Sequence, residues 1–299
     1  MHDHPKNSKK VIGAIIFNLA ISITAYVGGI VSGSLALISE AGHNLTDVLA
    51  LGIGYAGERL GERPSNKKHS FGYKRAEVLA ALINAIALIV IAIFIIVEAV
   101  HRWSAQTPVG LTMLFIFGAV GLVGNVASIW LLHEDAEKTL NRKAMYLHLF
   151  YDVLSSVAVI LSGIIIWLTG TYYIDLIVSI AISAFMLWNS LTLLRNVTHL
   201  IMQGVPDGVD MDAIRTDILS IPHVNDVHTL HVWGINSEEN ILSCHLCTQS
   251  KDTDKVIKDI TALMKKKHGI VHTTIQVERQ ALCNDGEEGH AAAHKEQHN

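Results

Sequence analysis

The chain has 299 residues, of which 50% are hydrophobic and only 17% charged, a balance typical of integral membrane proteins. The formal net charge of −4 and the lack of a basic patch with interleaved aromatic residues exclude nucleic acid as a partner. The long apolar runs lie between residue 11 and about residue 200, whereas the chain after Gly204 is polar and mixed in charge, so we expect a membrane domain followed by a soluble one.

Six apolar runs approach the length of about 20 residues that a membrane-spanning helix needs. They lie at residues 11–31, 35–58, 77–100, 109–132, 144–168 and 174–194. The first run is too long for a signal peptide and lacks a small-residue cleavage site, so we interpret it as a membrane helix. We predict an N-terminal tail over residues 1–10 and a transmembrane domain of six helices over residues 11–200.

The positively charged residues predict the orientation of these helices. Lysines and arginines gather before the first run, between the second and third, and between the fourth and fifth. The loops on the other side carry essentially only Arg102. Because cytoplasmic loops are enriched in Lys and Arg, we predict that both termini are cytoplasmic.

The polar part of the chain predicts a small α+β domain over residues 205–280, which we name the tail domain. Apolar spacing predicts helices at residues 210–221 and 253–267 and strands at residues 224–233, 241–247 and 271–277. The order αββαβ is that of a ferredoxin-like fold with two helices on one face of a three-stranded sheet. Residues 281–299 form a C-terminal tail that carries several histidines.

Two of the apolar runs contain a histidine followed four residues later by an aspartate. His43 and Asp47 in the second run differ by about 40° of rotation and about 6 Å of rise on a helix, so they share one face. His148 and Asp152 repeat the spacing in the fifth run. If the two helices pack together, their imidazoles and carboxylates match the tetrahedral shell of Zn²⁺. A bound metal, or a proton in its absence, would remove the cost of several kcal/mol for a carboxylate in lipid.

Packing offers the competing interpretation of such polar residues. One isolated His–Asp pair is better explained by packing or by a position at the membrane interface, but two pairs in separate spans favour a cation site. Glu40 and Asn44 lie one turn from His43, and either lining of the site or packing explains them. For Asn18, Asn84 and Asn125 we predict hydrogen bonds between helices.

Several stretches carry a resemblance to a known family. They are SGSLALISEAGHNLTD, HSFGYKRAEVLAALIN and YLHLFYDVLSSV in the apolar part, and LHVWGI, LSCHL and HTTIQVE in the tail domain. Over about residues 11–280 the chain resembles the cation diffusion facilitators, and its two HxxxD pairs resemble their zinc-preferring branch. The resemblance implies six spans, a cytoplasmic ferredoxin-like domain, a homodimer, and a transport site formed by His43, Asp47, His148 and Asp152.

The resemblance also implies a second metal site in the tail domain. Its ligands would be His231, His245, His272 and Glu278. Gln276 stands where some family members have a histidine, so the resemblance leaves open whether the tail domain binds one metal ion or two. In the family this domain responds to cytoplasmic metal, which makes zinc a regulatory as well as a transported ion.

The ligand chemistry predicts the mode of transport. Zinc needs neutral imidazoles and ionised carboxylates, so metal and protons compete for the same atoms. This competition predicts exchange of metal for protons, and the resemblance implies efflux, so we expect an efflux transporter that exchanges Zn²⁺, with Cd²⁺ and Co²⁺ as alternatives, for protons. We expect it to use no cofactor, to catalyse no reaction and, by analogy, to lie in a bacterial inner membrane.

Two alternatives stay open at this point. A membrane-anchored metal sensor would use the spans only as an anchor. An intramembrane metalloenzyme would need a catalytic base such as the glutamate of an HExxH motif, which the sequence lacks.

Overall fold

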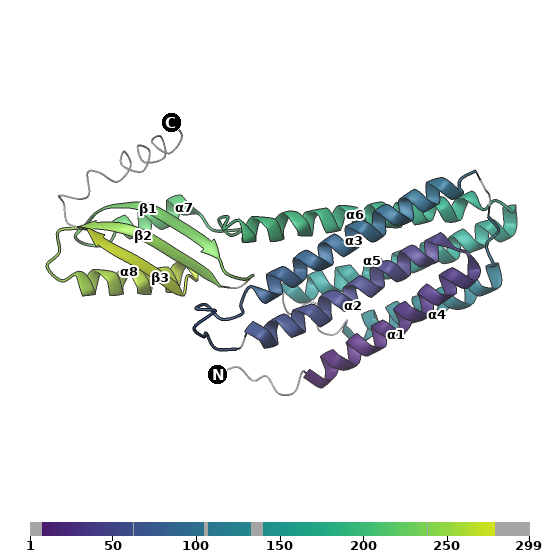
Figure 1. Ribbon diagram of the computed structural model, residues 1–299, viewed down its shortest axis with the longest axis horizontal. Coiled ribbons are helices and arrows are strands. Elements are labelled where there is room, and N and C mark those ends of the chain that lie inside the picture. The colour runs from purple at the N-terminus through teal and green to yellow at the C-terminus, as the bar shows by residue number, and fades with distance from the viewer. Residues whose placement is uncertain (1–7, 62, 105–106, 133–139, 238, 279–299) are drawn as a thin grey trace. The chain divides into compact units, whose positions relative to one another are not determined.

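The computed structural model describes residues 8–61, 63–104, 107–132, 140–237 and 239–278 (Figure 1). The chain divides into two compact units. The first comprises residues 1–59 and 79–195, and the second comprises residues 60–78 and 196–299.

Six long helices make up the apolar part of the described chain, one at each predicted run. They are α1 (Ser8–Ser32), α2 (Leu35–Gly61), α3 (Ala76–Arg102), α4 (Leu111–Leu132), α5 (Leu140–Thr169) and α6 (Tyr173–Ile201). Among the described residues, α3, the Phe150–Thr169 part of α5 and α6 are long and apolar enough to cross a membrane. A membrane domain is thus present, while the number of six spans stays a prediction.

Glycines bring α1, α4 and α5 into close contact. A Cβ atom added at Gly28 of α1 would lie 2.2 Å from Cγ of Phe117 in α4. One added at Gly124 of α4 would lie 2.3 Å from Cδ1 of Ile21, and one at Gly163 of α5 would lie 2.6 Å from Cδ2 of Leu114. Small residues allow membrane helices to approach this closely, so these helices pack along a tightly fitted surface.

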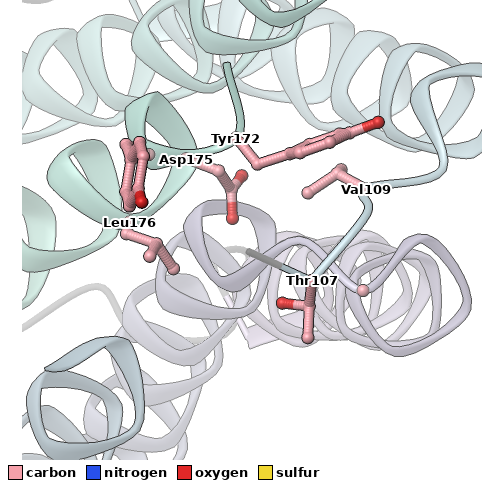
Figure 2. A pocket seen from close by; sticks show the side chains of 7 residues that line it. Thr107, Val109, Tyr172, Asp175 and Leu176 are labelled. Atoms are coloured by element: carbon pink, nitrogen blue, oxygen red, sulfur yellow. The ribbon is translucent and has the colours of Figure 1, made fainter. Parts of the chain in front are cut away.

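The start of α2 is capped by a residue of another helix. The carboxylate of Asp175, in the first turn of α6, accepts hydrogen bonds from the Ser34 hydroxyl and from the backbone N–H of Leu35 at 2.7 Å. A carboxylate suits a helix N-terminus because the first N–H groups have no partner within the helix. Figure 2 shows Asp175 in a small pocket that Thr107, Val109, Tyr172 and Leu176 also line.

The tail domain contains α7 (Met211–Leu219), β1 (Val224–Gly234), β2 (Asn240–Thr248), α8 (Thr253–His268) and β3 (His272–Glu278), labelled in Figure 1. The three strands form one sheet in the order β1-β2-β3, in which β1 pairs antiparallel and β3 parallel with β2. The predicted order αββαβ is confirmed.

One face of this sheet packs against both helices. Its core contains Ile214 and Ile218 from α7, Leu242 and Leu246 from β2, and Ile260 and Met264 from α8. Asp210 and Asp252 cap the N-termini of α7 and α8 through their side chains, as expected for Asp at this position. The opposite face of the sheet, which we name the open face, carries the polar residues that alternate with the core residues on the strands.

Candidate metal centres

The structure brings one residue of each predicted pair together. Nε2 of His43 in α2 lies 3.2 Å from Oδ1 of Asp152 in α5. Both side chains are largely buried, with 12% and 6% of their surface exposed. Two ligand atoms of a tetrahedral Zn²⁺ at about 2.0–2.1 Å are separated by about 3.3 Å. The spacing of this nitrogen and oxygen therefore fits one edge of a zinc coordination shell.

Asp47 and His148 belong to the same two helices. Each lies four residues from its described partner, on the turn that follows His43 in α2 and the turn that precedes Asp152 in α5. Their side chains lie outside the described part of the structure, so the complete set of four ligands stays a prediction.

A hydrogen-bonded group joins three helices next to this contact. The Ser156 hydroxyl, one turn after Asp152 in α5, donates to Oε1 of Glu40 in α2. Nδ2 of Asn125 in α4 donates to the Ser156 oxygen at 2.9 Å and to the carbonyl oxygen of Asp152 at 3.3 Å. The predicted interhelical hydrogen bonding of Asn125 is confirmed. Ser156 was not identified from the sequence, since a serine in an apolar helix most often bonds to its own backbone.

A second group of metal-ligating residues lies on the open face of the tail domain. Oε1 of Glu278 in β3 lies 2.8 Å from Nδ1 of His245 in β2, and Oε2 lies 3.2 Å from Nε2 of His228 in β1. One ligand atom from each of the three residues lies within 4.8 Å of the others. This arrangement could hold a divalent cation through two nitrogens and one carboxylate.

The group differs from the predicted set in two ways. It contains His228 of β1 where His231 was predicted, and it does not include His272 of β3. His228, not His231, is the residue of β1 that pairs with His245, whereas His231 pairs with Ser243. His272 pairs with Ile241, near the other end of β3 from Glu278, and its ring contacts Phe71 at 6.1 Å between centroids. Both His231 and His272 are exposed. His245 and Glu278 come together as predicted, and ligation by the full predicted set remains untested.

A break in the strand register explains why His228 was missed. Strand pairing is irregular between His228 and His231, and Thr229 has a φ of 50°. Val227 and Val232 both belong to the core although they are five residues apart, which regular alternation forbids. The irregularity therefore places both histidines on the open face. In the sequence, the signal that could have suggested His228 as a member of the group is the presence of two histidines three residues apart on one predicted strand.

Two family models match the chain. The model of the cation efflux transmembrane domain matches residues 11–202, and that of the cytoplasmic domain of cation efflux proteins matches residues 206–280. Together they include both groups of metal-ligating residues.

Curated relatives match over nearly the whole length. The zinc transporter ZitB of Pectobacterium atrosepticum is 36% identical, with 99% of this chain and 92% of the relative covered. The metal cation efflux system protein CzcD of Cupriavidus metallidurans is 36% identical over 98% of this chain and 92% of its own. A cadmium, cobalt and zinc/H(+)-K(+) antiporter of Bacillus subtilis is 34% identical over 95% of this chain and 94% of its own.

Among solved structures, the metal-bound C-terminal domain of the CzcD transporter is 29% identical and covers 23% of this chain and 99% of its own, with a TM-score of 0.23. The family models and the near full-length relatives agree on one assignment: the chain belongs to the cation efflux family.

Proposed function

We propose that this protein exports divalent cations, with Zn²⁺ as the first choice and Cd²⁺ and Co²⁺ as alternatives, in exchange for protons. The observation that carries the proposal is the buried contact of 3.2 Å between His43 and Asp152 on separate helices. The names of the relatives, which include a zinc transporter and a cadmium, cobalt and zinc antiporter, support the same substrates. The transport site would consist of His43, Asp47, His148 and Asp152.

The same two atoms can serve both halves of the exchange. With zinc bound, neutral His43 and ionised Asp152 each donate an electron pair to the metal. With zinc gone, a proton on His43 makes the contact a buried ion pair, which removes the isolated charge on Asp152. Because the observed separation of 3.2 Å already suits two ligands of one zinc ion, exchange of the metal for a proton requires no large movement of either side chain.

The tail domain would bind metal and regulate transport. His228, His245 and Glu278 are the best placed ligands, and His231 and His272 lie exposed on the same face for a further ion. The match to the cytoplasmic domain of cation efflux proteins supports a homodimer joined through residues 205–280. We further propose six spans, a ferredoxin-like tail domain, both termini in the cytoplasm and a place in the bacterial inner membrane.

Transport by purified protein in proteoliposomes tests the proposal directly. Zn²⁺, Cd²⁺ or Co²⁺ is supplied on one side with an imposed pH gradient, and metal flux and lumenal pH are followed together. Zinc flux coupled to an opposing proton flux is expected. Metal binding without any flux would contradict transport and favour a membrane-anchored sensor. Flux driven equally well by a K⁺ gradient at constant pH would contradict proton exchange.

A further inference from the structure

Glu40 is a buried acid beside the transport site that the proposed ligand set does not use. Its side chain lies one turn before His43 on α2, and the residue has none of its surface exposed. Among the described residues, the Ser156 hydroxyl is the only hydrogen-bond donor to Glu40, and it contacts Oε1. Oε2 is buried without a hydrogen-bond partner in this part of the chain.

The donors to Glu40 among the described residues are too few for an ionised carboxylate. An ionised carboxylate can accept about four hydrogen bonds and requires several when it is buried. The Ser156 hydroxyl has one proton but two acceptors in reach, namely Glu40 and the carbonyl oxygen of Asp152 at 3.1 Å. If Glu40 carries a proton, its O–H can donate to the Ser156 oxygen, and the Ser156 proton is then free for Asp152. The neutral form leaves only one carbonyl oxygen without a partner.

The charge of the neighbouring transport site also favours the neutral form of Glu40. Two carboxylates, Asp47 and Asp152, already balance the charge of a divalent cation. A third ionised carboxylate would leave an uncompensated negative charge inside the membrane, which is costly. A neutral Glu40 adds no charge in either the metal-filled or the protonated state of the site.

The neighbours of Glu40 connect it to the ligands through the backbone. Ser156 and Asn125 both contact the carbonyl oxygen of Asp152, while Glu40 and His43 lie one turn apart on α2. Gly121 of α4 lies beside the Glu40 carboxyl group, where a Cβ atom would be in ordinary van der Waals contact with Oε1 at 3.5 Å. The hydrogen bond between Glu40 and Ser156 therefore fixes α2 against α5 at the height where His43 meets Asp152.

We propose, on the basis of the proposed transport function, that Glu40 is a positioning residue that acts as a neutral hydrogen-bonding group and holds His43 beside Asp152. It neither binds the metal nor exchanges a proton. Its removal should weaken zinc binding, because groups that orient metal ligands typically change metal affinity by about 10–100-fold.

The test compares Glu40→Gln with Glu40→Ala in proteoliposomes, with Ser156→Ala and the double variant Glu40→Ala/Ser156→Ala beside them. Glutamine keeps the shape and a donor for Ser156 but cannot ionise. We expect Glu40→Gln to keep the KM for zinc within about twofold and to keep the pH midpoint of uptake. Glu40→Ala and Ser156→Ala should each raise KM by about tenfold or more, and the double variant should add little to either.

Glu98→Gln is the matched control, because Glu98 is an acid in α3 that pairs with Arg102. Loss of transport in Glu40→Gln, or a shift of its pH midpoint, would overturn the inference, since the charge of Glu40 would then be in use. Fully additive effects of Glu40→Ala and Ser156→Ala would also overturn it.

Failure of the proposed function would be recognised separately, as absence of zinc flux in the wild-type protein. In that case equilibrium binding of Zn²⁺ to the full chain decides the role of Glu40. The measurement is made in a His245→Ala/Glu278→Ala background, so that the tail domain does not dominate the signal. Glu40→Ala should bind at least about tenfold more weakly there and Glu40→Gln as tightly as the parent. Equal zinc affinity of the parent, Glu40→Ala and Glu40→Gln would overturn the inference. If Glu40→Ala does not fold, Ser156→Ala takes its place.

Discussion

The two groups of metal-ligating residues place a histidine at the same distance from a carboxylate but in different surroundings. His43 and Asp152 are 3.2 Å apart within the helices, and His228 and Glu278 are 3.2 Å apart on the sheet. The two pairs are similarly buried, with 12% and 6% of His43 and Asp152 and 6% and 10% of His228 and Glu278 exposed, but the pair on the sheet lies beside His245, which is 28% exposed. Water can therefore reach the sheet group, formed by His228, His245 and Glu278, at the partly exposed His245. Between the apolar helices, by contrast, a cation or a proton must balance the charge of Asp152.

This difference in access to water suits the two groups to different tasks, namely exchange of metal for protons between the helices and sensing of metal on the sheet. A site that cannot be left charged and empty must exchange one cation for another, which is the requirement for an antiporter. A site that water can enter can fill and empty according to the local metal concentration alone. We therefore expect substitutions at the first site to abolish transport and substitutions at the second to change only its regulation.

The largest effect is expected for Asp152→Ala. The substitution removes a negative ligand from a site of low dielectric constant, so zinc flux in proteoliposomes should fall by at least about 100-fold. Asp47→Ala should behave alike. Each variant should keep the elution volume of the wild-type protein in size-exclusion chromatography. Zinc flux near the wild-type rate in either variant would show that these carboxylates do not bind the transported ion.

His43→Asp should change selectivity and pH response. The substitution replaces a nitrogen ligand by a third carboxylate, which suits zinc less specifically and should narrow the preference for Zn²⁺ over Cd²⁺. A carboxylate stays ionised to lower pH than an imidazole stays neutral, with reference pKa values of about 3.9 and 6.5. The variant should therefore retain metal under mildly acidic conditions that empty the wild-type site.

Binding of both metals between pH 5.5 and 7.5 checks this expectation, in a His245→Ala/Glu278→Ala background that removes the sheet group. An unchanged metal preference together with an unchanged pH midpoint would mean that His43 does not contact the ion.

A smaller effect is expected on the sheet, where His228→Ala and His231→Ala form a matched pair three residues apart. Loss of His228 removes a ligand of the group and should weaken metal binding to the tail domain by at least about tenfold. His231 lies outside the group, so its substitution should change this affinity less than twofold. Both variants should transport zinc, and only His228→Ala should change how transport responds to metal on the tail-domain side. If His231→Ala weakened metal binding more than His228→Ala, His231 rather than His228 would be the ligand from β1.

The smallest effect concerns a contact between α7 and α8 without any metal. Asp217 accepts hydrogen bonds from Lys267 and His268, each at 2.6 Å, and these partners lower the pKa of Asp217 below its ordinary value. A lowered pKa means that the contact stabilises the fold above the pKa of the unfolded chain and is lost as pH falls through the pKa of the folded state.

Asp217→Asn should accordingly speed hydrogen exchange in the last turn of α8 at pH 7. The difference from the wild-type protein should shrink as pH falls below about 4. A difference that persists undiminished at low pH would contradict an electrostatic origin.

Helical periodicity made the first site readable from the sequence, because a spacing of four residues places His43 and Asp47 on one face whatever the rest of the chain does. The meeting of His43 with Asp152 then required only that two helices pack together. The partner of Glu40 could not be predicted, since Ser156 is 116 residues away and nothing local distinguishes it from other serines.

The sheet group was harder to predict because its geometry depends on pairing between strands. The order of elements followed from apolar patterns, and His245 and Glu278 were both identified. The choice between His228 and His231 depended on a register irregularity that strict alternation cannot reveal. A single extra residue in β1 is enough to bring His228 onto the open face beside His245, with His231 on the same face.

The glycine contacts of α4 have a mechanical consequence. Gly28, Gly124 and Gly163 are so close to side chains of the neighbouring helix that a Cβ atom at any of them would lie 2.2–2.6 Å from such a side chain. Sliding of α1 or α5 along α4 therefore meets steric resistance at these positions. We therefore expect α1, α4 and α5 to move as one block, and to carry Asp152 with them, when the proposed transport site opens toward one side of the membrane.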